Sequence, residues 1–301
     1  MNHSINNVTD TYKNPAASLN QEEESIGVAL MNNKMKVCLV TICIGEKYLQ
    51  QYNTLFRPSQ EKYAKKCGYD FKVITDYIDG PKQLHLISFN KILVCDYNWE
   101  KEYDFIIFID ADIIINENTP SIHNEYNFGD KIGVVNESQP TLQARIEHQI
   151  HKGYEVTAKD YYKLKSGHII ETDHIINTGV LVIQPKKHKV FLRKIFDTYF
   201  KKQINNPAGF HYEQSVIGYE IQKNNMHYFM DMKWNAIWAN NKYYFNKIKK
   251  QPLILQEFYD TNYFIHLAGH CDYHLIPTLK SCKNPNINNY RFFAKMPVSS
   301  F

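Results

Sequence analysis

The sequence lacks several features that mark specialised classes of protein. None of its six cysteines belongs to a CxxC pair, which argues against most zinc modules and favours a reduced compartment, where thiols pack as small hydrophobic groups. No run reaches the roughly 18 to 20 consecutive apolar residues of a membrane-spanning helix, and no basic patch with an apolar core opens the chain. We therefore expect a soluble protein without a transmembrane segment, located in the cytoplasm, or in the host cytoplasm if the source is viral.

The sequence also lacks a charge pattern suited to nucleic acid. The net charge of +4 is spread along the chain, and no basic stripe is interleaved with aromatic residues. A nucleic-acid partner is therefore not expected, whereas mild basicity suits a small anionic substrate. With 44% hydrophobic residues among 301, the chain has enough apolar material for the core of one large α/β domain or of two small ones.

Short apolar runs alternate with helical patterns after a polar N-terminus. Residues 1–33 are polar and without apolar periodicity, and we predict a flexible tail there. The pattern beyond it predicts strands over 36–44, 69–76 and 103–109, and helices over 57–68 and 84–99. This order is typical of an α/β fold with a mostly parallel central sheet flanked by helices.

Two carboxylates stand where the third predicted strand ends. The apolar run 105–109 precedes Asp110 and Asp112, and three isoleucines follow them. Ligands of open α/β sheets bind beyond the carboxyl ends of the strands, and side chains 110 and 112 share one side of an extended chain. Oxygen ligands suit Mn²⁺ or Mg²⁺, so we predict a cation that also binds phosphate oxygens. An acidic turn that caps the next element is the simpler alternative.

Other polar motifs form an ordered series along the chain. They are Thr41 and Asp76 at two strand ends, Lys91 one helix before the carboxylates, Asn177-Thr178-Gly179, Glu213-Gln214, and His266-Leu267-Ala268-Gly269. Over residues 36–270 this series resembles the nucleotide-diphospho-sugar glycosyltransferases of the GT-A (Rossmann-like) fold. It is most similar to the galactosyl- and xylosyltransferases of the xyloglucan and yeast mannan type, and more distantly to glycogenin-like transferases.

The resemblance implies a role for each motif. The metal ligands it implies are Asp110, Asp112 and His266, with Mn²⁺ (or Mg²⁺) as the cofactor. The implied contacts to the nucleotide-sugar are Thr41 and Asp76 around the uridine, Asp110-Ala111-Asp112, Asn177-Thr178-Gly179 and Gly269. The implied catalytic residues are Lys91, Glu213 and Gln214. One position departs from the family pattern, because His270 follows Gly269 where a cysteine is common.

The same resemblance implies the reaction. It is metal-dependent transfer of a hexose or pentose from a nucleotide-sugar, UDP-linked by resemblance, to a glycan, glycoprotein or other hydroxyl acceptor. Retention of anomeric configuration is expected, whereas an inverting enzyme would need Glu213 as its base. Residues 34–301 would form one glycosyltransferase domain, with a nucleotide-binding half over 34–135 and a donor and acceptor half over 136–301.

Other interpretations of the residues remain open at this stage. Each polar motif could be a plain strand end, turn or surface residue. A cluster rich in histidine and cysteine suggests zinc, but its spacing lacks CxxC and HExxH; its members are His266, His270, Cys271, His274 and Cys282. Trp234 and Trp238 are predicted to lie in the core, and a platform for the acceptor sugar is the alternative.

Three rival functions are also open. A sugar-nucleotide pyrophosphorylase carries a Gly-rich loop with arginine after its first strand, where this chain has Ile44-Gly45-Glu46-Lys47. A haloacid-dehalogenase-like phosphatase carries its acidic pair on the first strand rather than the third. A catalytically silent sugar-nucleotide-binding protein is the third rival, and the retention of both aspartates and of His266 argues against it.

Overall fold

The computed structural model describes residues 35–83, 86–97, 103–137, 157–205, 211–245, 251–270 and 272–279. The described residues from Lys36 onward belong to one compact unit. The predicted tail over 1–33 lies outside the described residues, so the tail and the division into halves stay predictions. Among the helices of the described ranges, none combines the length and the apolar character that crossing a membrane requires.

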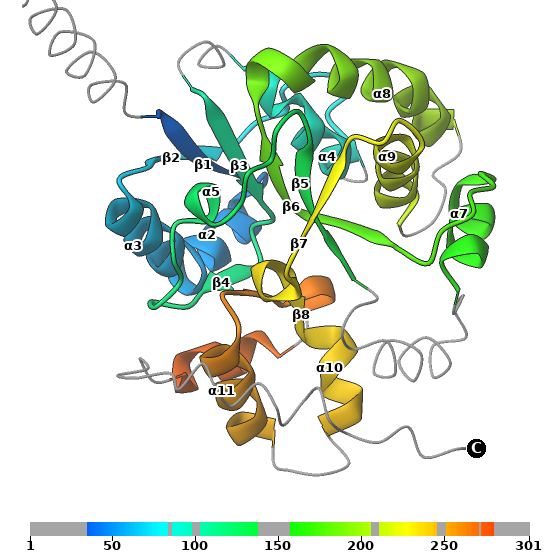
Figure 1. The fold of residues 1–301 in the computed structure, drawn as a ribbon. Coiled ribbons are helices and arrows are strands. Elements are labelled where there is room, and N and C mark those ends of the chain that lie inside the picture. Colours follow the sequence, from blue (N-terminus) through cyan, green and yellow to red (C-terminus); the bar gives the residue numbers. More distant parts are fainter. Residues whose placement is uncertain are drawn as a thin grey trace, which may run out of the picture. The chain divides into compact units, whose positions relative to one another are not determined.

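Six strands form the main sheet (Figure 1). In spatial order they are β2 (Asp70–Ile74), β1 (Val37–Ile42), β3 (Phe105–Ile109), β6 (Ile176–Ile183), β5 (Ile132–Asn136) and β7 (His227–Met230). The pairs β1·β2, β1·β3 and β5·β7 are parallel, whereas β6 is antiparallel to both of its neighbours. The predicted mostly parallel sheet is therefore confirmed. Strands β1 and β6 are buried along their whole length, which explains why most of their residues are apolar.

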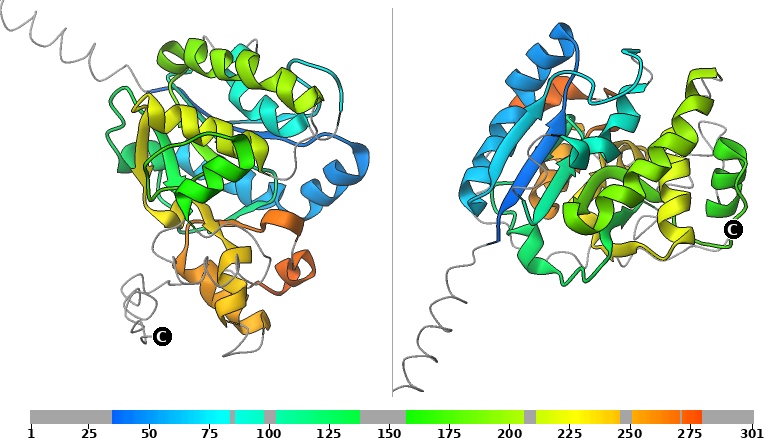
Figure 2. Two further views of the ribbon diagram at one scale, coloured as in Figure 1. Left: turned by 90° about the vertical axis from the view of Figure 1, so that its right-hand side faces the viewer. Right: turned by 90° about the horizontal axis from the view of Figure 1, so that it is seen from above.

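Helices cover both faces of this sheet (Figure 2). One face carries α3 (Arg57–Cys67), which follows α2 (Glu46–Leu55), and the other carries α8 (Pro185–Asn205) and α9 (Tyr212–Lys223). Neighbouring side chains of β1 point to opposite layers, as the period of two in a strand requires. Leu39 packs in one apolar cluster with Tyr63 of α3, and Val40 packs in the other with Phe196 of α8.

Of the two helices predicted from the sequence, one is confirmed and one differs. The helix predicted over 57–68 is confirmed as α3, which stops at Gly68 in the left-handed conformation (φ 69°). The helix predicted over 84–99 is instead a short α4 (Ile87–Asn90) followed by η2 (Lys91–Asp96), a 3-10 helix. The Asn90 amide donates to the Leu86 carbonyl oxygen at 3.3 Å. That oxygen is the acceptor a regular α-helix would offer to the Asn90 N–H, so the side chain competes with the helix.

A second, smaller sheet lies below the first in Figure 1. Its order is β4 (Ile113–Ile115), β9 (Phe264–His266) and β8 (Ala236–Ile237). The neighbouring helices are η4 (Met232–Asn235), α10 (Trp238–Phe245), α11 (Gln251–Thr261), η5 (Ala268–His270) and η6 (Tyr273–Thr278). Trp234 and Trp238 are 1% and 0% exposed and belong to apolar clusters, so their predicted core positions are confirmed.

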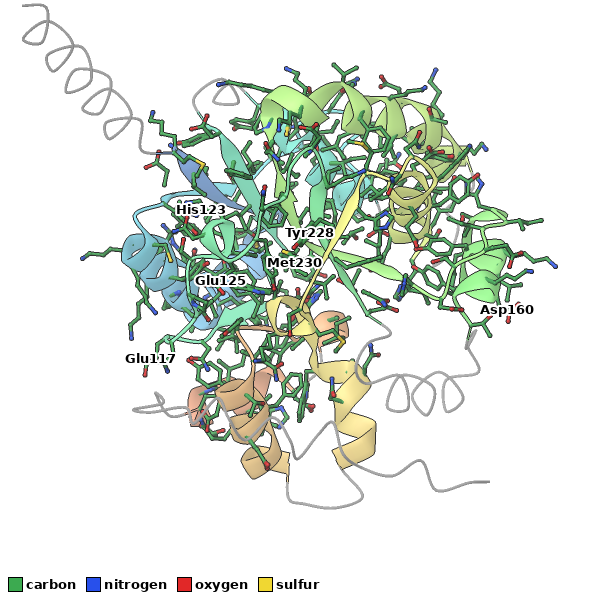
Figure 3. All side chains as sticks on the ribbon, viewed as in Figure 1. Glu117, His123, Glu125, Asp160, Tyr228 and Met230 are labelled. Carbon is green, nitrogen blue, oxygen red and sulfur yellow. The ribbon has the colours of Figure 1, made fainter. Side chains whose placement is uncertain are left out.

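Two further short helices and an edge strand complete the described structure. The helices are α5 (Ile122–Glu125) and α7 (Ala158–Ser166), and α7 begins after Thr157, whose hydroxyl accepts the backbone N–H of Asp160. On β7, Tyr228 and Met230 stand two residues apart and so share one face of the strand (Figure 3). Both pack into the cluster that holds Trp234.

Candidate active site

The two predicted aspartates lie where the chain passes from the large sheet to the small one. The Asp110 N–H donates to the carbonyl oxygen of Gly179 in β6 at 2.8 Å, and the carbonyl oxygen of Asp112 accepts the N–H of Leu267 after β9 at 3.0 Å. Residues 111 and 112 form a turn. The expectation that both side chains extend from one side of a strand is therefore corrected, because the turn, held by both sheets, brings them together.

A third ligand reaches the aspartates from the small sheet. Oxygen atoms of Asp110 and Asp112 and a ring nitrogen of His266 all lie within 4.8 Å of one another, so among the described residues these three side chains could hold a metal ion. The position of His266 is determined by the pairing of β9 with β4, which places His266 opposite Ile113. The side chain of His270 and all of Cys271 and Cys282, which the zinc alternative needs, lie outside the described residues.

The positions of these three side chains suit a divalent cation. The Nε2 atom of His266 is 3.1 Å from Oδ1 of Asp112 and 3.8 Å from Oδ2 of Asp110. Adjacent ligands around an octahedral ion with bonds near 2.1 Å are about 3 Å apart, so these atoms need little movement to share one ion. Two carboxylates and one imidazole are ligands that Mn²⁺ or Mg²⁺ can use, and positions remain for phosphate oxygens.

Lys91 is a buried cation beside this cluster. It is 5% exposed, and its Nζ lies 3.1 Å from Oδ1 of Asp110, 3.7 Å from Oε1 of Glu213 and 3.4 Å from Oγ1 of Thr178. Burial lowers the pKa of the ammonium, but the carboxylates of Asp110 and Glu213 outweigh it and raise that pKa above its usual value. Burial also raises the pKa of the Asp110 carboxyl, against the opposing effect of Lys91. The site therefore favours additional positive charge.

Glu213 and Gln214 lie in the first turn of α9, which begins at Tyr212. The residue before the helix, His211, has a left-handed backbone (φ 77°). Glu213 faces the cavity described below, whereas Gln214 is buried and its amide donates to the hydroxyl of Tyr161 at 2.9 Å and to a carboxylate oxygen of Glu137 at 3.4 Å. The two adjacent side chains therefore have different surroundings.

Asn177, Thr178 and Gly179 lie inside strand β6, so the alternative of a tight turn does not apply. Gly179 is required by close approach rather than by a turn. A Cβ atom there would lie 2.5 Å from Cε1 of His266 and 2.9 Å from Oδ1 of Asn177, distances that real Cβ contacts essentially never show. The glycine makes room for the imidazole. Gly269, in η5, has φ 75° and turns the chain after His266.

A cavity of about 420 Å³ opens beside the cluster. Its lining residues are Ile42, Cys43, Tyr48, Gln51, Tyr52, Phe56, Ile87, Ser88, Lys91, Phe108, Asp110, Ala111, Asp112, Glu213 and Tyr273. Thr41 and Asp76 are not among them. Thr41 is fully buried in β1, and Asp76 is an exposed residue 2.7 Å from the ammonium of Lys82. Their contact with uridine therefore stays a prediction.

Three residues of the site are absent from the sequence prediction. Glu137 follows β5 and could have been found by the rule that located Asp110, since it is a carboxylate directly after an apolar strand. Tyr273 donates to Oδ2 of Asp112 at 3.4 Å, and Asn235 accepts at 2.9 Å from His266. No local pattern marks Asn235, because it is one buried amide between core residues.

Comparisons with known proteins agree with this geometry. A glycosyltransferase involved in glycosylation of the major capsid of PBCV-1 has a similar structure, with a TM-score of 0.53, 14% identity, and coverage of 81% of this chain and 98% of that one. An active-site mutant of LgtC has a TM-score of 0.52 and 11% sequence identity, with coverage of 87% of this chain and 98% of LgtC. The bifunctional glycosyltransferase WbbM has a TM-score of 0.52 and 12% sequence identity, with coverage of 88% of this chain and 52% of WbbM. At these identities the likeness shows the fold alone, and the predicted GT-A fold is confirmed.

The sequence itself gives the family. No curated protein matches it. The model of glycosyl transferase family 8, however, matches residues 4–280, which is most of the chain. A match of that extent, together with the fold and the cluster of Asp110, Asp112 and His266, establishes that the chain belongs to glycosyl transferase family 8.

Proposed function

We propose that the protein moves a hexose or pentose from a UDP-linked sugar to a hydroxyl group of a glycan or glycoprotein, with Mn²⁺ or Mg²⁺ and with retention of anomeric configuration. The family makes it a nucleotide-sugar-dependent glycosyltransferase. One observation carries the rest of the proposal. Asp110, Asp112 and His266 converge, and the two aspartates line a cavity together with Lys91 and Glu213.

The roles of these residues follow from the charge that the reaction creates. Cleavage of the bond between the anomeric carbon and the β-phosphate oxygen leaves negative charge on the diphosphate. A divalent cation, when bound, supplies electrostatic stabilisation of that charge. Asp110, Asp112 and His266 are the residues that would hold it. Lys91 adds a preorganised ammonium at the same cavity wall, and its burial reduces the screening of its field by water.

Retention needs no separate base, because the departing phosphate oxygen can accept the proton of the acceptor hydroxyl. The surroundings of Glu213 support this part of the proposal. Its carboxylate forms an ion pair with the Lys91 ammonium at 3.7 Å, so it already has a partner within the site. If the product were inverted, Glu213 would be the carboxylate in place to take the proton, since it lines the cavity.

We propose that the donor occupies the cavity of about 420 Å³. Aromatic rings of Tyr48, Tyr52 and Phe56 form part of its wall, and flat apolar faces suit a nucleobase or a sugar ring. The resemblance to galactosyl- and xylosyltransferases supports galactose, glucose or xylose as the transferred sugar. The acceptor class, a glycan or glycoprotein, rests on the family.

The proposal is tested by incubating the purified protein with UDP-galactose, UDP-glucose and UDP-xylose, with Mn²⁺ or with EDTA, and measuring released UDP. Water replaces the acceptor in this assay. We expect Mn²⁺-dependent UDP release with at least one donor, and loss of release in Asp112→Asn. NMR of the product with a disaccharide acceptor then reports the anomeric configuration.

The same reactions separate the rival functions. A pyrophosphorylase would form UTP and a sugar 1-phosphate when pyrophosphate is added, and a phosphatase would release inorganic phosphate. Binding of UDP without turnover of any of the three donors, across the acceptors tested, would indicate a silent binding protein. Each of these results would contradict the proposed transferase.

A further inference from the structure

A row of buried amides connects the backbone of β6 to the imidazole of His266. The Gly179 N–H donates to Oδ1 of Asn177 at 2.9 Å, Nδ2 of Asn235 donates to the same oxygen at 2.7 Å, and Oδ1 of Asn235 lies 2.9 Å from Nδ1 of His266. The three side chains are 5%, 1% and 4% exposed. The two links made by Asn235 could not be seen in the sequence, because Asn235 is 58 positions from Asn177 and 31 from His266.

We propose that Asn235, oriented by Asn177, is a positioning residue that fixes the tautomer and the ring orientation of His266 for metal binding. The inference rests on the metal-dependent function proposed above. It assigns Asn177 a task in the wall of the metal site, in addition to the contact with the donor sugar that the family resemblance implies.

The direction of the row is set by a group that cannot reverse. A backbone N–H only donates, so the Asn177 atom facing Gly179 must be its oxygen, and the amide of Asn177 cannot be turned over. Its Nδ2 then faces a carboxylate oxygen of Glu137 at 3.1 Å, which accepts. Both ends of Asn177 therefore agree on one orientation.

The orientation of Asn177 in turn determines which nitrogen of His266 carries the proton. Because Oδ1 of Asn177 accepts, the Asn235 atom beside it must be the NH₂ group, and the oxygen of Asn235 is left to face the imidazole. That oxygen cannot donate, so Nδ1 of His266 carries a proton. In the neutral ring the lone pair is then on Nε2, the atom 3.1 Å from Oδ1 of Asp112. A backbone N–H thus decides which nitrogen binds the metal.

The neighbouring residues disfavour a reversed Asn235 amide and a rotated His266 ring. A reversed Asn235 would set its oxygen against Oδ1 of Asn177, an unfavourable pair at a buried position. Rotation of the imidazole is limited by Gly179, whose Cα position leaves space for the ring and for nothing larger. Hydrogen bonds to the second nitrogen are a general means of orienting metal-binding histidines.

Two variants and one control test this proposal by isothermal titration with Mn²⁺ alone. Asn235→Leu removes the acceptor, and we expect Mn²⁺ affinity to fall by about 10- to 100-fold. Asn235→Asp keeps an oxygen beside Nδ1 but removes the NH₂ group that donates to Asn177, so we expect part of the affinity to return. Asn241→Leu is the matched control, since Asn241 is also buried and its side chain donates to the carbonyl oxygen of Ile237 in β8, just before its own helix. We expect it to bind Mn²⁺ as the wild type does.

The tautomer is measured on the unaltered protein, so that the test does not depend on whether the variants fold. ¹⁵N NMR of labelled histidine with saturating Mg²⁺, a diamagnetic ion, should show His266 protonated at Nδ1. Protonation at Nε2, or Asn235→Leu affinity within twofold of the wild type, would overturn the inference. Mn²⁺ binding that responds to Asn235 but supports no turnover of any nucleotide-sugar would instead contradict the proposed function and leave this inference intact.

Discussion

Replacement of Gly179 by alanine tests whether the imidazole of His266 is fixed in place. The new methyl carbon would lie 2.5 Å from Cε1 and 2.8 Å from Nδ1 of the ring. The ring must therefore move by about 0.9 Å, from 2.5 Å to an ordinary contact of 3.4 Å, which exceeds the tolerance of about 0.2 Å in metal–ligand distances. We expect Gly179→Ala to weaken Mn²⁺ binding by at least about tenfold.

The same substitution should reduce stability by a predictable amount. Overpacking a filled core costs about 1–3 kcal/mol, and replacement of glycine returns about 0.4–1 kcal/mol through the unfolded chain. The net loss is therefore about 1–2 kcal/mol, which lowers the melting temperature by about 2–4 °C per kcal/mol in a chain of this class. Thermal unfolding in EDTA measures this change without the metal.

Gly133→Ala is the matched control for this prediction. Gly133 lies in β5, and a Cβ atom there would be 2.5 Å from Cε1 of Phe128 and 2.9 Å from Cβ of Val182, away from the metal ligands. We expect a similar loss of stability with unchanged Mn²⁺ affinity. If Gly179→Ala binds Mn²⁺ as tightly as the wild type, or if Gly133→Ala weakens binding equally, the argument from close approach is wrong.

Three other changes give distinct expected results. Lys91→Met removes the buried ammonium and should lower sugar transfer by about 10²-fold or more while Mn²⁺ binding, measured by titration, is retained; loss of binding would contradict a role toward the diphosphate. Asp112→Asn should abolish the rise in melting temperature with Mn²⁺, which in the wild type corresponds to about 2.7 kcal/mol at 100 times the Kd; a persisting rise would remove Asp112 from the ligands. Trp238→Phe loses the 2.7 Å hydrogen bond from Nε1 to Asp272, and thermal unfolding should show a loss of stability of about 1–3 kcal/mol. The Mn²⁺ affinity should be unchanged, and a lower affinity would show that this hydrogen bond supports the site.

The fold was predictable where burial shaped the sequence directly. Strands β1 and β3 are central, so the residues of β3 are all apolar, those of β1 are apolar except Thr41, and the positions of both strands could be recognised. Helix α2 gave no such signal, since Tyr52 alone is buried among its ten residues and no side chain caps its start after Gly45. The antiparallel direction of β6 was also not predicted, because strand direction depends on long connections rather than on residue pattern.

The residues of the candidate site also differ in how far the sequence predicts them. Asp110 and Asp112 were found locally, because carboxylates after a buried strand are conspicuous. His266 meets them only through the pairing of two three-residue strands, β4 and β9, and the sequence suggested it by family resemblance rather than by pattern. Neither a local pattern nor the family resemblance indicated Asn235, since an amide that acts through another side chain needs no recognisable neighbours in sequence.

The charges at the site indicate the order in which its partners bind. Asp110, Asp112 and Glu213 contribute three negative charges beside the single positive charge of Lys91, and His266 is neutral when its Nε2 binds a metal. Burial lowers the pKa of His266, but Asp112 and Asp110 outweigh it and raise that pKa, so the site without a metal has a net negative charge of one to two and repels a diphosphate, whose own charge is negative. A divalent cation held by Asp110, Asp112 and His266 would cancel this charge and attract the phosphate oxygens. We therefore expect the cation to bind before the nucleotide-sugar.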